Sequence, residues 1–130
     1  MNEKKKILII DDDKFLVHMY AIKFEAGGFS VTSSLSGLEA LEKIRNGFVP
    51  DIILLDLIMP GMDGFAFLEN LRKEKLCNDS IIVMLTNQGL ASDISKAEEY
   101  GINGYIVKAT TIPSEVVEEI KQIYKKVKKS

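Results

Sequence analysis

Short apolar runs separated by longer helical patterns constrain the fold of this chain most strongly. Four of them are continuously apolar, which is typical of strands buried on both faces of a parallel sheet. These runs are Ile7–Ile10, Ile52–Leu55, Ile81–Leu85 and Tyr105–Val107. A fifth run, Phe29–Ser34, alternates apolar and polar residues. This alternation favours an edge strand with one face in water.

Five amphipathic segments lie between and after these runs, and their polar ends indicate where helices begin. The first is predicted to follow Asp13 and to bury Leu16, Met19, Tyr20 and Phe24. The others are predicted in SGLEALEKI, which has Ser36 and Glu39 in capping-box spacing, in DGFAFLENLRK from Asp63, in ASDISKAEEYG after Leu90 and in PSEVVEEIKQIYKKV from Pro113. The alternation predicts an α/β fold, a (βα)5 arrangement of five parallel strands with helices on both faces.

Length and composition restrict the class of protein. The 130 residues fit one domain, and we expect a single domain over residues 1–130 with no output domain. The single cysteine, Cys77, cannot form an internal disulfide, which favours a cytoplasmic setting. No apolar run approaches the ~20 residues of a membrane span. The formal net charge of -2 gives no overall bias toward nucleic acid, and the basic segment KKVKKS is expected to be a solvated helix end.

Charged and polar residues follow the ends of four predicted strands. They are Asp11 with Asp12, Asp56, Thr86 and Lys108. The carboxyl ends of parallel strands meet at one edge of the sheet, where open α/β sheets bind ligands. Each residue alone could be an ordinary helix cap, turn residue or strand terminus. Together on four strand ends they predict a functional site.

Phosphoryl transfer is the chemistry that this set of groups fits best. Carboxylate oxygens are ligands for Mg²⁺, and an aspartate can act as a nucleophile that becomes an aspartyl phosphate. A metal ion and a lysine supply the cationic charge that this transfer needs, and a hydroxyl adds a hydrogen bond. The sequence has no cysteine or histidine pair for zinc and no glycine-rich nucleotide loop. The acceptor is therefore expected to be the protein itself.

Four motifs in one order carry a resemblance to a known family. ILIIDDD, DIILLDLIMPGMDG, IIVMLT and GYIVK together resemble the receiver domain of two-component response regulators, the CheY-like family, over about residues 5–127. The resemblance implies the strand order 2-1-3-4-5, which is the known order of that family and is not worked out from the residues.

The resemblance also implies a metal site. Asp56 matches the phosphorylated aspartate, Asp12 the acid that binds Mg²⁺ directly and Asp11 the acid that holds it through water. Mn²⁺ is expected as an alternative ion. Ile58 matches the position whose backbone carbonyl binds the metal. Asp13 matches no ligand, and we expect it to cap the first helix.

Further matches concern the phosphoryl group and the response to it. Thr86 and Lys108 match the hydroxyl and ammonium that contact the phosphoryl group, and Tyr105 matches an aromatic residue that moves with the threonine in a switch. The chain departs from the family at Asn87, where a small residue is usual, and at Ala109, where proline is usual. Because a cis bond before a residue other than proline costs about 2.5–4 kcal/mol, we expect the Lys108–Ala109 bond to be trans.

The predicted function is that of a stand-alone response regulator. It would take a phosphoryl group from a histidine kinase or phosphotransfer protein in a Mg²⁺-dependent reaction, and signal to an unknown downstream protein by contact. We expect no enzymatic activity beyond self-phosphorylation and self-dephosphorylation, no DNA-binding domain, no membrane contact, and a monomer or weak dimer. Two alternatives stay open: a small aspartate-nucleophile phosphatase resembling the haloacid dehalogenase group, and a binding module that is not phosphorylated.

Residues near the predicted site carry smaller expectations. Phe15, near the acid pair, is a candidate for docking the phosphodonor, whereas the single histidine, His18, is expected on the surface. Apolar Ile58 and bulky Asn87 predict slow loss of the phosphoryl group, because hydrolysis needs an in-line water. Gln88 could act in the opposite direction by holding that water.

Overall fold

The computed structural model describes residues 4–87 and 90–128, which form alternating strands and helices. The strands are β1 (Lys6–Ile10), β2 (Ser30–Ser34), β3 (Ile52–Leu55), β4 (Ile81–Thr86) and β5 (Gly104–Val107). The α-helices are α1 (Lys14–Ala26), α2 (Gly37–Arg45), α3 (Gly64–Lys73), α4 (Ala91–Glu99) and α5 (Pro113–Lys128), and a 3₁₀ turn, η1, spans Lys108–Thr110. None of the helices described has the length and apolarity to cross a bilayer.

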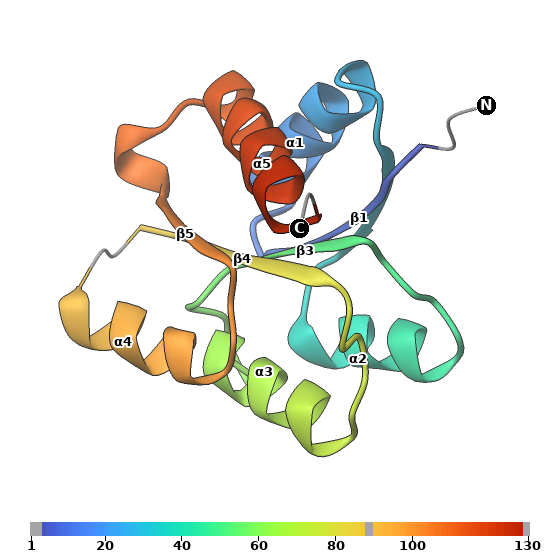
Figure 1. The fold of residues 1–130 in the computed structure, drawn as a ribbon, viewed down its shortest axis with the longest axis vertical. Coiled ribbons are helices and arrows are strands. Elements are labelled where there is room, and N and C mark those ends of the chain that lie inside the picture. The colour runs from blue at the N-terminus through green and yellow to red at the C-terminus, as the bar shows by residue number, and fades with distance from the viewer. Residues whose placement is uncertain (1–3, 88–89, 129–130) are drawn as a thin grey trace.

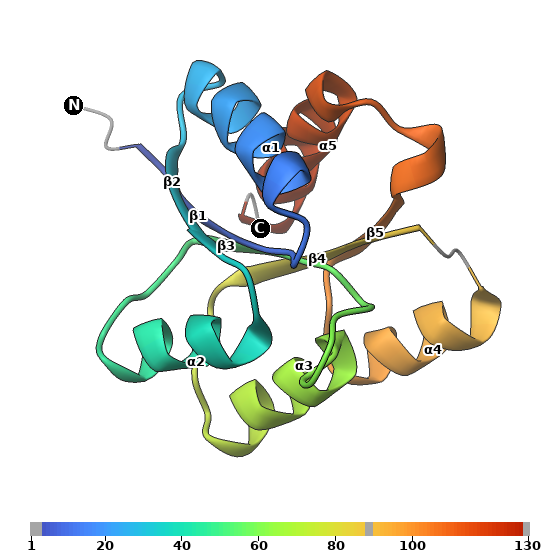
Figure 2. The same ribbon diagram turned by 180° about the vertical axis from the view of Figure 1, so that it is seen from behind.

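The strands form one parallel sheet in the order β2-β1-β3-β4-β5. Helices α1 and α5 cover one face, and α2, α3 and α4 cover the other (Figure 1). The same three layers are seen from behind in Figure 2. The expected fold class and the strand order implied by the resemblance are therefore confirmed, and β2 lies at the predicted edge. The expectation that Tyr105–Val107 is buried on both faces is wrong, because β5 forms the other edge and only Ile106 in it is buried.

The neighbouring inner strands β1 and β3 are continuously apolar because both of their faces are buried. Ile7, Ile9, Ile52 and Leu54 point into the core under α1 and α5, whereas Leu8, Ile10, Ile53 and Leu55 point into the core under α2, α3 and α4. All eight side chains are at most 1% exposed. Burying each such side chain contributes roughly 1.5–3 kcal/mol, so this strand pair holds much of the stability of both cores.

Polar side chains cap three helices at the carboxyl edge of the sheet. The carboxylates of Asp13 and Asp63 and the hydroxyl of Ser36 accept hydrogen bonds from backbone N–H groups in the first turns of α1, α3 and α2, at 2.8–3.1 Å. Such a cap contributes about 1 kcal/mol. The predicted capping box is only half formed, because Glu39 is paired with Lys43 at 3.2 Å.

The buried face of α1 differs from the prediction. Val17, Tyr20 and Phe24 are buried, whereas the predicted core residues Leu16 and Met19 are only partly buried. The prediction is therefore correct for Tyr20 and Phe24, and Leu16 still packs against the core, but the spacing did not reveal that Val17 is buried.

Helix α5 leaves the core toward its C-terminal end. Val116, Val117 and Ile120 are buried, Tyr124 is partly buried and Val127 is 37% exposed. The helix therefore meets the core fully through its first half and partly through Ile123 and Tyr124. Its last turns form surface at the amino edge of the sheet, because the helix runs antiparallel to the strands.

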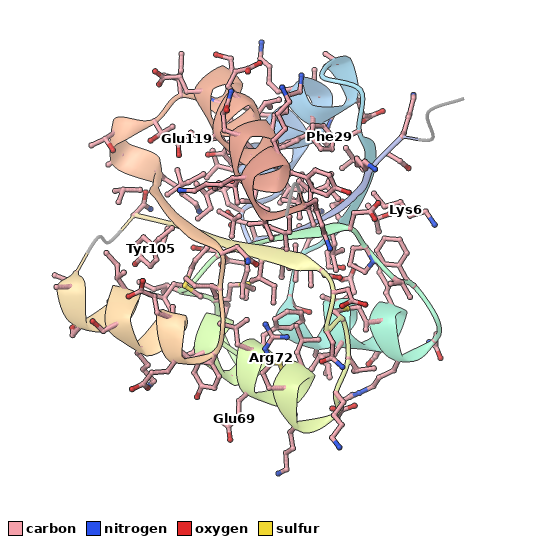
Figure 3. The ribbon with its side chains drawn as sticks, in the orientation of Figure 1. Lys6, Phe29, Glu69, Arg72, Tyr105 and Glu119 are labelled. Carbon is pink, nitrogen blue, oxygen red and sulfur yellow. The ribbon has the colours of Figure 1, made fainter. Side chains whose placement is uncertain are left out.

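Side chains join the helices on the face opposite α1 and α5. The guanidinium of Arg72 on α3 donates from Nε to the carbonyl of Tyr100 at the end of α4, at 2.7 Å (Figure 3). The ammonium of Lys96 on α4 lies 4.4 Å from the ring centroid of Phe65 on α3. These contacts attach α4 to α3, and α4 contributes only Ala97 as a buried residue.

Candidate functional site

The register of the central strands places two aspartates side by side. Ile10 pairs with Leu55, and the pattern continues one residue further, since the Asp56 N–H donates to the Ile10 carbonyl at 2.9 Å. The Asp11 N–H donates to the Ser34 carbonyl of β2 at 3.2 Å. The backbone of Asp11 and Asp56 is therefore fixed by neighbouring strands at the carboxyl edge.

A close helix–loop contact supports the chain after Asp56. The Gly64 N–H donates to the Leu57 carbonyl at 2.8 Å. A Cβ added at Gly64 would lie 2.8 Å from the Asp56 carbonyl oxygen and 2.9 Å from the Leu57 Cα. Only glycine therefore allows the first turn of α3 to pack against this backbone.

Three carboxylates converge at this edge. Oxygens of Asp11, Asp12 and Asp56 all lie within 4.8 Å of one another. Asp11 and Asp56 are buried, at 2% and 7% exposure, while Asp12 is exposed. A hard divalent cation takes oxygen ligands and offsets the repulsion between carboxylates at this spacing, so the donor set fits Mg²⁺ or Mn²⁺. The predicted carboxylate cluster is thus assembled in the fold.

Lys108 places a positively charged side chain beside these acids. Its Nζ lies 2.6 Å from Asp11 Oδ2 and 3.6 Å from Asp56 Oδ1. Burial lowers the pKa of Lys108, but the hydrogen bond to Asp11 and the charge of Asp56 outweigh burial and raise the pKa above its ordinary value. The Lys108–Ala109 bond is trans, as predicted, and η1 begins at Lys108. The lysine therefore reaches both acids without the proline usual in the resembled family.

Asp56 is the acid whose protonation is most perturbed. Burial raises its pKa, the neighbouring charge of Asp11 raises it further, and Lys108 opposes both, which places the pKa at about 6. A backbone hydrogen bond from Ile58 also lowers it. The group is thus a carboxylate at neutral pH, as a nucleophile must be, and it is held there against an unfavourable environment.

Thr86 and Tyr105 lie on the next two strands. Thr86 ends β4, is buried at 1% exposure and pairs with Val107, directly before Lys108. Tyr105 on β5 packs against the core under α2, α3 and α4 (Figure 3). Burial raises the pKa of Tyr105, and the charge of Asp93 on α4 raises it further. The two residues thus connect the site edge with α4.

The segment after Asp56 presents an apolar side chain to solvent. Ile58 is 54% exposed, whereas Leu57 and Met59 on either side are buried. That its carbonyl binds a metal stays a prediction. Asn87 is exposed, and Gln88 lies outside the described residues.

The surface of α1 near the acids matches the expectations. Phe15 is 72% exposed and His18 is exposed. A docking role for Phe15 stays a prediction. Asp13 accepts hydrogen bonds from the Phe15 and Leu16 N–H groups and so caps α1, as expected.

Tyr20 is a buried core residue on which the charges of the site act, and the sequence did not reveal this. It was expected only as a core residue of α1, and it is 3% exposed. Burial raises the pKa of its phenol, and the charges of Lys108, Asp11 and Asp56 act on it. A tyrosine combines an apolar ring with a polar tip, so a buried tyrosine on the helix that begins at the acid pair was the available signal.

Comparisons with known proteins agree with this geometry. The family model described as response regulator receiver domain matches residues 7–121. A probable transcriptional regulator ycf27 of Porphyridium aerugineum is 34% identical over 128 residues, which are 98% of this chain and 51% of that protein. The phosphate regulon transcriptional regulatory protein PhoB of Escherichia coli (strain K12) is 30% identical over 123 residues, which are 95% of this chain and 53% of that protein. The chain spans about half the length of these curated relatives.

Solved structures show the same architecture. The chemotaxis protein CheY4 of Vibrio cholerae has a TM-score of 0.85 at 26% identity, covering 93% of this chain and 99% of that chain. A CheY-like response regulator receiver domain protein from Methanospirillum hungatei JF-1 has a TM-score of 0.86 at 28% identity and covers 98% of both chains.

Proposed function

The chain belongs to the response regulator receiver domain family, and on that premise we propose that it is a signalling domain controlled by phosphorylation of Asp56. The donor is a histidine kinase or a phosphotransfer protein, and the setting is cytoplasmic. One observation carries the proposal: the Asp56 carboxylate, directly after β3, lies beside Asp11 and Asp12, with the Lys108 ammonium 3.6 Å away.

The proposed transfer uses the side chains of this edge. A carboxylate oxygen of Asp56 attacks the phosphorus of a phosphohistidine, the P–N bond breaks, and the imidazole leaves with its electron pair and takes up a proton. A divalent cation bound by Asp11, Asp12, Asp56 and the Ile58 carbonyl would supply positive charge for the phosphoryl oxygens.

Lys108 and the strand end beside it complete the site in this proposal. The Lys108 ammonium, which lies near both Asp11 and Asp56, turns partly from Asp11 toward the phosphoryl oxygens and interacts with their negative charge. The Thr86 hydroxyl donates one more hydrogen bond to the phosphoryl group.

The proposed output is a change near α4. Thr86 moves toward the phosphoryl group, and Tyr105, which is partly buried beside α4, follows it inward. Since α4 has a single buried residue, Ala97, it is the helix that such a movement displaces at the smallest cost. The altered surface is then read by a downstream protein through direct contact.

Labelling by a small phosphodonor tests the proposal. With acetyl phosphate and Mg²⁺, the intact mass of the parent should rise by one phosphoryl group, and removal of the metal with EDTA should prevent this. Asp56→Asn should gain no mass. The matched control is Asp63→Asn, which changes an exposed helix-capping acid at the same edge and should still be labelled.

Two results would contradict the assignment. One is labelling of Asp56→Asn to the extent seen in the parent. The other is release of phosphate over many turnovers from a range of phosphomonoesters, which is expected of an aspartate-nucleophile phosphatase.

A further inference from the structure

A hollow at the amino edge of the sheet lies at the opposite end of the strands from the aspartates. It has a volume of about 310 Å³ and is bounded by α5, by the residue before β1 and by the turn between α1 and β2. Its walls are formed mainly by Lys5, Gly28, Phe29, Lys121, Tyr124 and Lys125. This site is independent of the proposed phosphorylation.

The floor of the hollow is apolar and recessed. Phe29 is 6% exposed and packs edge-on against Phe24, with ring centroids 5.2 Å apart. Gly28 has a φ of 95°, and no atom lies within 4 Å of a Cβ added there. The ring of Tyr124 forms the side next to α5. A side chain from outside can therefore enter above Gly28 and contact aromatic carbon.

The rim of the hollow is positively charged. Lys5 Nζ lies 5.1 Å from the centroid of the Tyr124 ring, and Lys121 and Lys125 project from α5. Among the described residues of the lining, Glu118 is the only acid, and it lies 4.0 Å from Lys121. Three cations thus face one anion in a chain whose formal net charge is -2.

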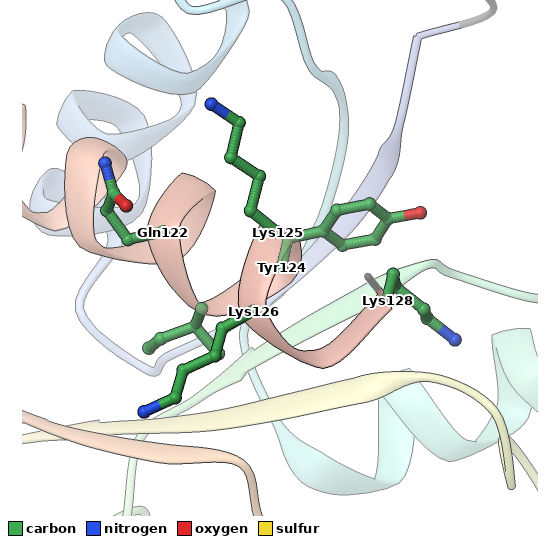
Figure 4. Close-up of a pocket in the computed structure, with 6 residues that line it drawn as sticks. Gln122, Tyr124, Lys125, Lys126 and Lys128 are labelled. Carbon is green, nitrogen blue, oxygen red and sulfur yellow. The ribbon is translucent and has the colours of Figure 1, made fainter. Parts of the chain in front are cut away.

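A second, wider hollow extends the positive surface around the end of α5. It has a volume of about 850 Å³. It shares Gln122, Tyr124 and Lys125 with the first hollow and adds Ile123, Lys126 and Lys128. Figure 4 shows Lys125 and Lys126 extending in opposite directions from the helix. The cationic groups therefore surround the last turns of α5 on both sides.

We propose that the hollow beside Tyr124 docks an acidic, amphipathic segment of a partner protein. Apolar side chains of that segment fill the recess over Gly28 and Phe29, and its carboxylates meet Lys121 and Lys125 at the rim. Complementary charge of this kind speeds association and selects the partner.

The shape of the hollow favours a protein segment over two other anionic partners. A bilayer binds apolar side chains that protrude, whereas here Phe29 is 6% exposed and Lys5 Nζ lies over the Tyr124 ring. A nucleic acid base stacks on an open ring face, but Lys5 covers one face of Tyr124, and the lining contains no arginine.

Fluorescence anisotropy with a defined probe tests this proposal. The probe is a short labelled helical peptide with glutamates on one face and leucines on the other. Reversing charge with Lys121→Glu and Lys125→Glu should weaken binding about tenfold or more, since two favourable contacts become repulsive. The control pair, Lys73→Glu and Lys75→Glu, carries the same charge change on exposed residues of the opposite face and should alter binding less than about twofold.

Further measurements locate the bound peptide and distinguish a protein partner from a nucleic acid or a membrane. The NMR shift changes that the peptide causes in the protein's backbone amides should be largest around Gly28 and Tyr124. Binding should weaken as the salt concentration rises from about 0.05 M to 0.3 M. Labelling of Asp56 should be the same in both pairs of variants. Equal peptide affinity in the two pairs, or tighter binding of an oligonucleotide or of phosphatidylglycerol vesicles at the same residues, would overturn the proposal.

Discussion

The two edges of the sheet carry opposite charge in opposite settings. At the carboxyl edge, Asp11 and Asp56 are buried together with a single cation, Lys108. At the amino edge, lysines such as Lys125 and Lys126 stand in solvent around an apolar recess. Parallel strands impose this division, because every helix begins at the first edge and ends at the second, and helix ends favour these charges.

The two edges differ more in how far their charged side chains are buried than in the sign of their charges. The Lys108–Asp11 pair has side chains 8% and 3% exposed, whereas the Lys121–Glu118 pair has side chains 41% and 68% exposed. Exposed pairs contribute between about 0 and 1 kcal/mol, while breaking a buried pair costs several. Buried charges can thus perturb one another enough for chemistry, whereas exposed charges remain available to a partner.

Removing the buried cation should give the largest effect. In the absence of metal, Lys108→Met should lower the free energy of unfolding by about 3 kcal/mol or more, because it leaves Asp11 and Asp56 without their cation. Lys125→Met at the amino edge should change it by less than about 0.5 kcal/mol. Urea denaturation at about pH 7.5 measures both. Equal losses in the two variants would contradict the contrast between the edges.

Removing the perturbed acid should stabilise the metal-free protein. The pKa of Asp56 rises from 3.8 to about 6 on folding, so between these values the folded state holds a proton that the unfolded state releases. The stability of the parent should therefore fall as pH rises from about 4 to 6, by up to about 3 kcal/mol from this group.

The variant Asp56→Asn isolates this contribution. The difference in unfolding free energy between variant and parent should be small near pH 4 and should favour the variant increasingly up to about pH 6. Urea denaturation across this range, with EDTA present, measures the difference. A difference independent of pH would show that burial of Asp56 does not strain the fold.

Stabilisation of the protein by Mg²⁺ should depend on the carboxyl edge of the sheet and not on the amino edge. At a free Mg²⁺ concentration about tenfold above its dissociation constant, the parent should gain about 1.4 kcal/mol. Asp12→Asn, which removes one carboxylate of the cluster, should lose most of this gain, while Lys125→Glu should keep it. Thermal unfolding with and without Mg²⁺ provides the measurement. Full stabilisation of the Asp12 variant would exclude that acid as a ligand.

The smallest effect is expected at Tyr20. Tyr20→Phe keeps the buried ring and removes only the hydroxyl, so stability should change by about 1 kcal/mol or less. If the phenol contributes to the field at Lys108 and Asp56, the rate of labelling by acetyl phosphate should change while the fold is unaltered. An unchanged rate would limit Tyr20 to packing.

Much of the fold could be predicted because its main signals are local. Runs such as Ile52–Leu55 are apolar at every position, which only a strand covered on both faces requires. The caps at Asp13 and Asp63 depend on a few neighbouring residues. The acids at the strand ends could be placed together because parallel strands share an edge.

Other features depend on packing that no local pattern records. The burial of Val17 on α1 was missed, because the apolar spacing alone did not show that Val17 meets the core more fully than Leu16 and Met19. The effect of the site charges on Tyr20 depends on how α1 lies over the sheet. The sequence predicted only that the basic segment KKVKKS is a solvated helix end. It could not predict the hollow beside Tyr124, because Lys5 and Phe29 join it from distant parts of the chain.

The strand order also governs when the charges of the site meet during synthesis. Asp11, Asp12 and Asp56 follow β1 and β3, which pair directly, whereas Lys108 follows β5, the last strand to leave the ribosome. Chains emerge N-terminus first, so the three carboxylates can gather before their lysine exists as part of the fold. Until β5 pairs with β4, Lys108 cannot balance them, so ions from solution or protons must do so. Under the proposed function, a nascent chain could therefore bind its divalent cation before Lys108 joins the site.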